Sequence, residues 1–385
     1  MNLVALKMLV GDRAKYIGIL IGVTFASLLI TQQSSIFWGL MTRTFAAITD
    51  MGQPQVWVMD PKVQFIDDVK PLQSTELYRV RGVDGIEWAV PLYKGLLRAR
   101  LADGTFQQII CLGLDDTSLL GGPPEMVEGT LEDLRRSEGV IVDAVGARTK
   151  LAKPSSVPGQ PPTPLRVGDT LEINDHRAVV VGLCKVQRTF QSQPVVYTTF
   201  SRATNFAPRE RKLLSFVLVG AKPGVDVADL CKRIRVETGL AAWTSDEFKV
   251  MTMGYFLKNT GIPVNFGISV LLGFLVGTVI AGQTFYNFTL DNLKQFGALK
   301  AMGTTNGMLV RMVLLQALLV GSIGYGLGVG AASLFGLLTK NTELAFRMPW
   351  WVLVAGGVAV LLICTISALI SIRKVIKLEP AVVFK

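Results

Sequence analysis

Histidine is nearly absent from this sequence, with His176 alone among 385 residues. A single histidine excludes a multi-histidine metal site and disfavours a Ser-His-Asp triad, because a triad would depend on this one residue. It follows an Asn-Asp pair, a context typical of a turn rather than of a catalytic base. We identify no other constellation of catalytic side chains, so the sequence does not predict an enzyme.

Cysteine is also scarce, at four residues. Cys111, Cys184 and Cys231 lie between the first and second long apolar segments, each in an apolar context and none in a CxxC pair. Two expectations stay open. One pair forms a disulfide in an oxidising compartment and leaves an odd thiol, or all three stay unpaired and buried.

Charged residues make up only 18% of the chain, against roughly 25% in soluble domains, whereas hydrophobic residues make up 50%. This composition disfavours a disordered protein, a nucleic-acid-binding arm and an ordinary cytosolic enzyme. No GxxxxGK[ST] motif occurs, so ATP binding through a P-loop is excluded. The formal net charge is nevertheless +10, which requires charged and apolar residues to lie in different parts of the chain.

Four apolar segments are long enough to cross a bilayer, which takes about 20 helical residues for a hydrocarbon core about 30 Å thick. They are Ile17–Phe37, Val264–Phe288, Met312–Leu338 and Trp350–Ile372. The first continues into polar residues without a small-residue cleavage site, so we interpret it as an uncleaved anchor.

The charges that flank these segments predict their orientation. Residues 41–262 hold 27 basic and 25 acidic residues and are almost neutral. If both termini are cytoplasmic, the cytoplasmic stretches carry ten basic and three acidic residues, a net charge of +7. The positive-inside rule then places residues 41–262 outside, and Trp38, Trp350 and Trp351 fall at the outer interface, where indole rings prefer to lie.

The segment between the first two spans has the mixed pattern of an α+β domain. Two hairpins are predicted, Gly95–Arg100 with Thr105–Leu112 and Leu165–Ile173 with Ala178–Leu183. Further elements are expected as strands at Val56–Met59, Val63–Ile66 and Ser215–Val219 and as an amphipathic helix at Val227–Thr238. The run Pro154–Pro164 contains five prolines and is expected to be an exposed loop, which leaves partner binding open as its role.

Glycines are frequent inside the predicted spans, and a GxGxGxG string begins at Gly324. A dinucleotide site is excluded, because the string lies within an apolar helix rather than between a strand and a helix. The spacings of four from Gly324 to Gly328 and from Gly273 to Gly277 instead predict faces where another helix approaches closely. The middle of each span lacks charged residues, which disfavours an ion pathway or a proton relay.

The loop after the second span carries the clearest functional signal. Leu293, Phe296 and Lys300 share one helical stripe and Gly303 can end the helix, so a short amphipathic helix is predicted within residues 290–307. This helix could lie on the membrane surface or dock a partner, and its residue pattern alone leaves both open. The small Gly-Ala step after Phe296 leaves a surface that a partner could approach.

This loop resembles the coupling helix of the FtsX/MacB-type ABC transporter permeases, whose pattern is Gly-x-Leu-(Lys/Arg)-Ala-x-Gly. Residues 297–303 read Gly-Ala-Leu-Lys-Ala-Met-Gly. The C-terminal run from Arg373 resembles the family's closing signature of a basic helix followed by Glu379-Pro380-Ala. The usual Glu-Arg at the start of the coupling helix is replaced by Leu-Asp-Asn, and this departure is closer to the DevC branch of heterocyst-type exporters.

The resemblance implies a fold and a location. The fold is the MacB/FtsX-like (type VII ABC transporter) permease fold, with four transmembrane α-helices and a large extracytoplasmic α+β domain inserted between helices 1 and 2. The implied location is the bacterial inner membrane, with both termini cytoplasmic. The first two spans are expected to continue outward as a stalk at Ser34–Thr49 and Asp246–Asn259.

The resemblance also implies partners. The permease works as a homodimer with separate cytoplasmic ATPase subunits, which bind ATP and Mg, so no cofactor is expected in this chain. Movement passes to the outer domain by mechanotransmission. The DevC branch adds a periplasmic adaptor (membrane-fusion) protein, an outer-membrane duct and a lipid-like or hydrophobic cargo. Membrane lipids are further partners, and nucleic acid is not.

The residues expected to couple to the ATPase follow from the matching motifs. They are Asp291, Lys294, Phe296, Gly297, Ala298, Lys300, Ala301, Gly303, Glu379 and Pro380. Phe296 is expected to fill a groove of the partner, Gly297 to permit close approach, and Lys300 to meet acidic residues at the rim.

Two alternatives share this topology. One is an FtsX-like regulatory subunit that controls a periplasmic cell-wall hydrolase, and the other is a Lol-type permease that releases lipoproteins. The regulatory relatives usually have a much smaller exterior domain, so the long insertion favours export.

The predicted organisation runs from a cytoplasmic amphipathic helix to a cytoplasmic tail. Its segments are the N-terminal helix 1–15, span one 16–40, the extracytoplasmic domain 41–262, span two 263–289, the coupling helix 290–307, span three 308–339, an outer loop 340–349, span four 350–372 and the tail 373–385.

Overall fold

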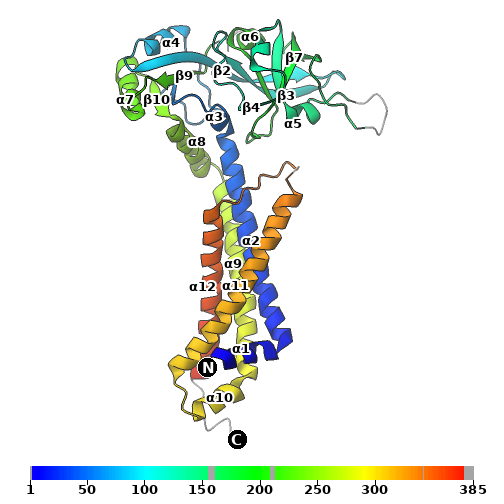
Figure 1. The fold of residues 1–385 in the computed structure, drawn as a ribbon, viewed down its shortest axis with the longest axis vertical. Coiled ribbons are helices and arrows are strands. Elements are labelled where there is room, and N and C mark those ends of the chain that lie inside the picture. The colour runs from blue at the N-terminus through cyan, green and yellow to red at the C-terminus, as the bar shows by residue number, and fades with distance from the viewer. Residues whose placement is uncertain (1, 155–160, 209–212, 341, 377–385) are drawn as a thin grey trace. The chain divides into compact units, whose positions relative to one another are not determined.

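The computed structural model describes residues 2–154, 161–208, 213–340 and 342–376 (Figure 1). The chain divides into two compact units. A helical unit comprises Met1–Leu40 and Gly261–Lys385, and an inserted domain comprises Met41–Thr260.

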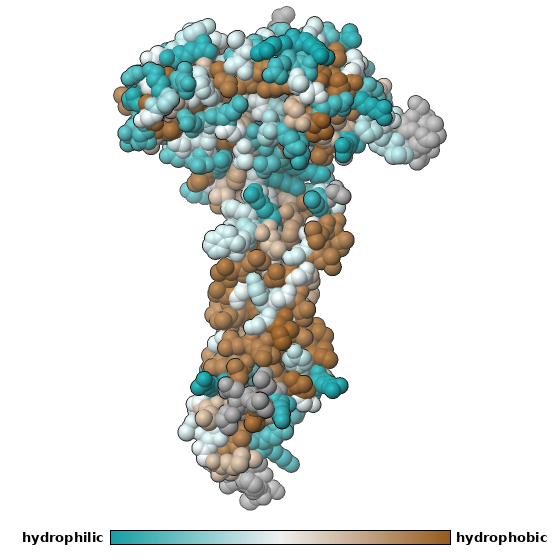
Figure 2. Space-filling view, in the orientation of Figure 1, coloured by the Kyte–Doolittle hydropathy of each residue, from teal (hydrophilic) through white to brown (hydrophobic). Residues whose placement is uncertain are grey.

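The helical unit contains six helices within its described residues. They are α1 (Asn2–Gly11), α2 (Arg13–Thr44), α9 (Ile262–Asp291), α10 (Leu293–Ala301), α11 (Asn306–Leu338) and α12 (Trp350–Ile376). Four of them, α2, α9, α11 and α12, are long and apolar enough to cross a membrane, and each contains one predicted span. Apolar surface covers much of these helices in Figure 2.

Hydrogen bonds from small polar side chains join the long helices. Between α12 and α9, the Ser371 hydroxyl donates to the Phe285 carbonyl at 2.9 Å. Between α2 and α11, the Ser27 hydroxyl donates to the Tyr325 carbonyl at 3.2 Å, and the Tyr325 hydroxyl donates to the Leu353 carbonyl of α12 at 2.7 Å. These side chains therefore hold helices together rather than line an ion path.

The N-terminal helix α1 differs from the amphipathic helix expected there. Ala5 and Leu9 are buried in the apolar cluster of the helical unit, but Val4 and Val10 on other faces are exposed. The buried Gln316 side chain of α11 donates to the Ala5 carbonyl at 2.7 Å. The helix thus has apolar residues on more than one face. One face packs on α11, and the apolar residues of the other face are exposed.

The inserted domain contains all ten strands of the described residues. Its elements are α3 (Ala46–Asp50), β1 (Val56–Met59), α4 (Ser74–Arg81), β2 (Ile86–Arg100), β3 (Phe106–Leu114), β4 (Glu125–Glu128), the 3-10 helix η1 (Leu131–Arg135), β5 (Gly139–Asp143), α5 (Ala144–Arg148), β6 (Thr170–Ile173), β7 (His176–Lys185), β8 (Val195–Thr199), α6 (Phe200–Phe206), β9 (Phe216–Ala221), α7 (Val227–Thr238), β10 (Ala241–Thr244) and α8 (Ser245–Asn259).

An antiparallel sheet in the order β10-β1-β9-β2 forms one lobe of this domain. Its residues alternate between two apolar clusters, as the period of two of a strand requires. Val56 and Val58 of β1 belong to the cluster that includes residues of α4 and α7, whereas Trp57 and Met59 share a cluster with Phe248 of α8. The sheet is therefore packed on both faces.

A ring of six strands forms the other lobe, as the pairings β2-β3-β8-β5-β7-β6 return to β2. All six strands contribute buried residues to one apolar cluster, among them Leu97, Cys111 and Val180. The long strand β2 belongs to both lobes, pairing with β9 over Ile86–Leu92 and with β3 over Tyr93–Arg100. The domain is thus α+β with a partly closed sheet.

Both predicted hairpins form, since β2 pairs with β3 and β6 with β7 in antiparallel register, but β6 begins at Thr170 and not at the predicted Leu165. Helix α7 spans the predicted residues, with Asp226 accepting the Ala228 N–H at its start and Gly239 at φ 71° at its end. The strand predicted at Val63–Ile66 is wrong. Asp60 accepts the Lys62 N–H at 2.8 Å and folds the chain into a turn, although Val63 and Ile66 are still buried.

Of the two predicted stalk segments, the first is shorter than expected. It was expected to reach Thr49, but α2 ends at Thr44 and α3 follows as a separate helix. The second, expected at Asp246–Asn259, is the helix α8, from Ser245 to Asn259. In the proline-rich run, Lys153 and Thr163 exchange two backbone hydrogen bonds of 2.8 Å that close the loop, whose residues 155–160 lie outside the described part.

Candidate coupling site

The helix break between α9 and α10 sets the start of the candidate coupling helix. The Asn292 side chain donates to the Phe288 carbonyl at 2.8 Å, while the Asn292 carbonyl accepts the Phe296 N–H at 3.0 Å. Asn292 thereby closes one helix and opens the next. Helix α10 spans Leu293–Ala301, so Leu290 and Asp291 belong to α9, and the coupling helix is shorter than the predicted 290–307.

A Schellman motif ends α10 where the sequence places a glycine. The Gly303 N–H donates to the Lys300 carbonyl at 3.0 Å, and the Thr304 N–H donates to the Leu299 carbonyl at 3.1 Å. Gly303 has φ 94°, a conformation that L side chains rarely adopt. The glycine therefore ends the helix as predicted.

The role predicted for Phe296 is wrong. Its side chain is fully buried in the apolar cluster of the helical unit, together with Phe285 of α9 and Leu309 and Met312 of α11. Gly297 is buried beside it. The ring therefore anchors α10 to its own chain and is not available to fill a groove in a partner, and the same burial argues against a partner contact at Gly297.

The opposite face of α10 is the exposed one. Among the predicted residues, Lys294, Ala298, Ala301 and Gly303 are exposed, as is Asp291 at the end of α9, and Lys300 is half-buried. Glu379 and Pro380 lie outside the described residues.

Two exposed methionines were missed by the sequence analysis. Met302, at the end of α10, is 74% exposed, and Met308, in the first turn of α11, is 45% exposed. Met302 directly follows Ala301, and its N–H donates to the Ala298 carbonyl at 3.0 Å. An exposed methionine beside small residues is a feature of surfaces that dock a partner. The sequence did carry a signal for Met302, since it directly precedes Gly303. A side chain next to the glycine that ends a helix lies at the exposed end of that helix.

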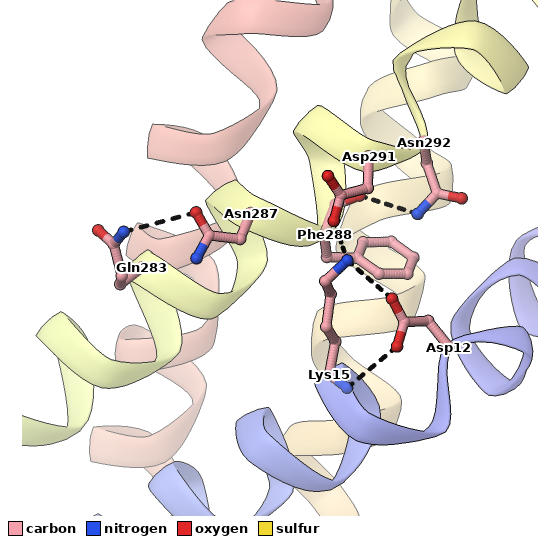
Figure 3. A network of polar contacts seen from close by, with 7 residues as sticks. All are labelled: Asp12, Lys15, Gln283, Asn287, Phe288, Asp291 and Asn292. Carbon is pink, nitrogen blue, oxygen red and sulfur yellow. Dashed lines mark hydrogen bonds and ion pairs between the residues drawn. The ribbon is translucent and has the colours of Figure 1, made fainter.

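A charged network lies at the junction of α2 and α9 (Figure 3). The Lys15 ammonium contacts Asp12 at 2.8 Å and also forms an ion pair with Asp291. Hydrogen bonding and the nearby charge of Lys15 lower the pKa of Asp12 below its ordinary value. The junction thus joins the start of the first span to the residue that precedes α10 by two positions.

Glycines of the spans lie at close helix contacts. A Cβ atom on Gly324 would come within 2.8 Å of the Val23 side chain of α2, and one on Gly328 within 2.5 Å of Ser27. On α9, a Cβ on Gly273 would lie 3.2 Å from Leu29, and one on Gly277 would overlap Ala26. The four predicted packing glycines therefore all face α2.

The inserted domain offers neither a metal site nor a reactive thiol among its described residues. No group of three His, Cys, Asp or Glu side chains in the described part of the chain could hold a metal ion. Cys111, Cys184 and Cys231 are buried and free. Of the two expectations, the one with three unpaired, buried cysteines therefore holds. Burial raises the pKa of Cys111 to about 12 and that of Cys231 to about 11, which leaves them unreactive near neutral pH.

Comparison with known families decides what this arrangement belongs to. The family model described as MacB-like periplasmic core domain matches residues 16–236, more than half of the chain. The model described as FtsX-like permease C-terminal matches residues 256–380. This chain belongs to the MacB/FtsX-type ABC transporter permeases.

Relatives of this permease carry the same description. It is 22% identical to an uncharacterised ABC transporter permease of Mycobacterium tuberculosis over 82% of its own length and 79% of the relative's. It is 24% identical to an uncharacterised ABC transporter permease of Methanocaldococcus jannaschii, over 56% of its own length and 57% of that relative's. The periplasmic region of MacB from Actinobacillus actinomycetemcomitans aligns with 55% of this chain and 96% of that one, at 16% identity and a TM-score of 0.36.

The family assignment makes the four apolar helices spans of a multi-pass membrane permease and the inserted domain a MacB-like periplasmic domain. Placement in the DevC branch stays a prediction. So does the expectation that this chain binds no cofactor.

Proposed function

We propose that this permease transmits ATP-driven movements of separate cytoplasmic ATPase subunits to its periplasmic domain, and that two copies act together. In this role, the ATPase subunits bind ATP and Mg and press on α10, and the movement passes along the spans. The resulting motion of the periplasmic domain drives export of a lipid-like or hydrophobic cargo. A periplasmic adaptor and an outer-membrane duct complete the path, as in the DevC branch.

The two-sided structure of α10 is the observation that carries this proposal. Phe296 fixes one face of α10 in the bundle, while Ala298 on the other face and Met302 at its end are exposed, as is Met308 in the first turn of α11. A helix held in this way can pass a push from a partner to the spans, whereas a helix held only by lipid would yield. We therefore place the anchor for the ATPase at Met302 and Met308 instead of at Phe296.

The polar side chains of the spans support movement of helices rather than passage of cargo between them. Ser27, Tyr325 and Ser371 are engaged in hydrogen bonds between helices. A path for ions or polar cargo through the bundle would need polar or charged side chains that are not engaged between helices. Transport by motion of the periplasmic domain does not require such a path.

Replacing Met302 by Asp tests the docking surface. The variant places a carboxylate in an interface expected to be apolar, so binding of the ATPase should weaken by at least about tenfold, as for a central contact residue. The measurement is co-purification of the ATPase with the permease, followed by the ATPase rate of the complex. The matched control is Val236→Asp, on the 85% exposed Val236 of the periplasmic helix α7, which should bind the ATPase normally.

Equal ATPase binding by the Met302→Asp variant and the wild type would remove this surface from the interface. The proteins that co-purify also separate the alternatives. An adaptor and a duct support export, a cell-wall hydrolase supports an FtsX-like regulator, and a lipoprotein carrier supports a Lol-type permease.

A further inference from the structure

A single lysine joins the first span to the end of the second, directly before the coupling helix. Lys15 lies in the first turn of α2, and its ammonium contacts Asp12 at 2.8 Å and pairs with Asp291, the last residue of α9 (Figure 3). Two carboxylates from different segments thus share one cation. The contact links residues separated by 276 positions in the chain.

The three charges are partly exposed, with Lys15 and Asp12 about one quarter to one third exposed and Asp291 more than half. Ion pairs at such positions contribute little to folding stability. Their effect on geometry is larger, because removing the lysine leaves two carboxylates facing each other, and like charges at close range repel. The pair therefore adjusts how the end of α9 lies against the start of α2, next to the close contacts of Gly18 and Gly22 with α9.

The position of Asp291 determines which helices the Lys15–Asp291 ion pair connects. Asn292, the next residue, accepts the Phe296 N–H and so fixes the first turn of α10 relative to α9. Because Asp291 is the neighbour of Asn292 in the chain, a displacement of α10 also displaces Asp291. Lys15, the other partner of the ion pair, belongs to α2, the helix from which the chain enters the periplasmic domain at Met41.

We infer that Lys15 is a positioning residue that passes movement of the coupling helix α10 directly to the first span, through its ion pair with Asp291. This inference rests on the proposed function. Without this ion pair, a push on α10 reaches α2 only through the apolar packing of the helices, in which Phe296 and the glycines of α9 take part. The movement that arrives at the start of α2 is then smaller.

The test uses the full-length permease reconstituted with its ATPase in lipid nanodiscs. The readout is the change in amide hydrogen exchange within residues 41–260 on adding a non-hydrolysable ATP analogue. Lys15→Met should reduce that change about fivefold or more, within the usual range of coupling between sites, while ATPase binding and basal hydrolysis persist. A purely structural role would instead lower the stability or yield of the complex.

Three further variants and a matched control sharpen the result. Lys15→Arg keeps the cation and should respond like the wild type, and the double exchange Lys15→Asp with Asp291→Lys should recover the response by pairing across the same helices. Asp291→Asn keeps the Asp12–Lys15 pair, avoids the facing carboxylates and should still lose the response. Lys232→Met, which removes an exposed ion pair with Asp229 on α7, is the matched control and should behave like the wild type.

A normal response of Lys15→Met beside a responding wild type would overturn the inference and leave the proposed function intact. The inference would also be overturned if Lys15→Met lost the change in hydrogen exchange and the double exchange did not restore it. The ion pair itself would then not be what transmits the movement. If the wild type shows no ATP-dependent change at all, the proposed function fails instead.

Discussion

Asp50 shows how burial changes the chemistry of one residue in the periplasmic domain. It is only 6% exposed, and its carboxylate accepts the Gln187 N–H at 2.9 Å. Burial raises the pKa of Asp50 from its ordinary value of 3.8 to about 6. A cavity of about 20 Å³, enough for one water molecule, is lined by Asp50, Lys94 and Thr189, whose buried hydroxyl has no partner among the described residues.

The raised pKa predicts a pH dependence of stability. Between about pH 4 and pH 6 the folded state binds the proton of Asp50 more tightly than the unfolded state does, so this residue's contribution falls as the pH rises and levels off above about 6. Asp50→Asn keeps the size and an acceptor but does not ionise. The variant should be more stable than the wild type at pH 7, by at most about 3 kcal/mol.

Denaturant unfolding of the purified protein at pH 4.5 and pH 7, followed by tryptophan fluorescence, measures this difference. Asp246→Asn is the control, because the Asp246 side chain is 91% exposed in the same domain. If Asp50→Asn and the wild type have the same pH dependence, the Asp50 carboxylate is not buried as described.

At the scale of the helix, the glycines of α11 divide into two kinds. Gly324 and Gly328 face α2 at distances that leave no room for a side chain. Gly326 and Gly330, of the same string, have nothing within 4 Å of the position of a Cβ. The string therefore has one packed face and one open face, as a spacing of four on a helix requires.

Replacing Gly328 by Leu should destabilise the bundle, because the new side chain meets Ser27 and the Leu28 backbone nitrogen, which cannot move aside. We expect a loss of about 1–3 kcal/mol, as for other overpacked sites. Gly326→Leu adds the same side chain on the open face and should be neutral or slightly stabilising, since leucine favours helix. Thermal unfolding of both variants in detergent measures the difference, and equal transitions would contradict the packing.

The elements that the sequence predicted well are those in which local chemistry decides the structure. The spans follow from length and apolarity, the hairpin at residues 95–112 from its Asp-Gly turn, and the end of α10 from Gly303. Val63–Ile66 was misassigned because an apolar run does not reveal that Asp60 turns the chain. Phe296 was misassigned because its burial depends on helices distant in sequence, including Leu309 and Met312 of α11.

At the scale of the whole molecule, charge and apolar surface are segregated between parts with different tasks. The helical unit uses its few polar side chains for hydrogen bonds between helices, and the charges near α10 bind one another or remain exposed. The periplasmic domain is nearly neutral, with 27 basic and 25 acidic residues in 41–262. The net charge of +10 therefore lies mainly outside that domain, and by the positive-inside rule it predicts an orientation with both termini in the cytoplasm.

That orientation is testable with single cysteines, because the four native thiols are buried and free. Ala102→Cys adds an exposed thiol in the β2–β3 hairpin, and Asn306→Cys adds one at the start of α11. If both termini are cytoplasmic, a membrane-impermeant maleimide should label the first variant in intact spheroplasts and the second only after the membrane is permeabilised. The wild type, which should stay unlabelled in both conditions, is the control. Labelling of Asn306→Cys in intact spheroplasts would reverse the topology, and α10 could then not meet a cytoplasmic ATPase.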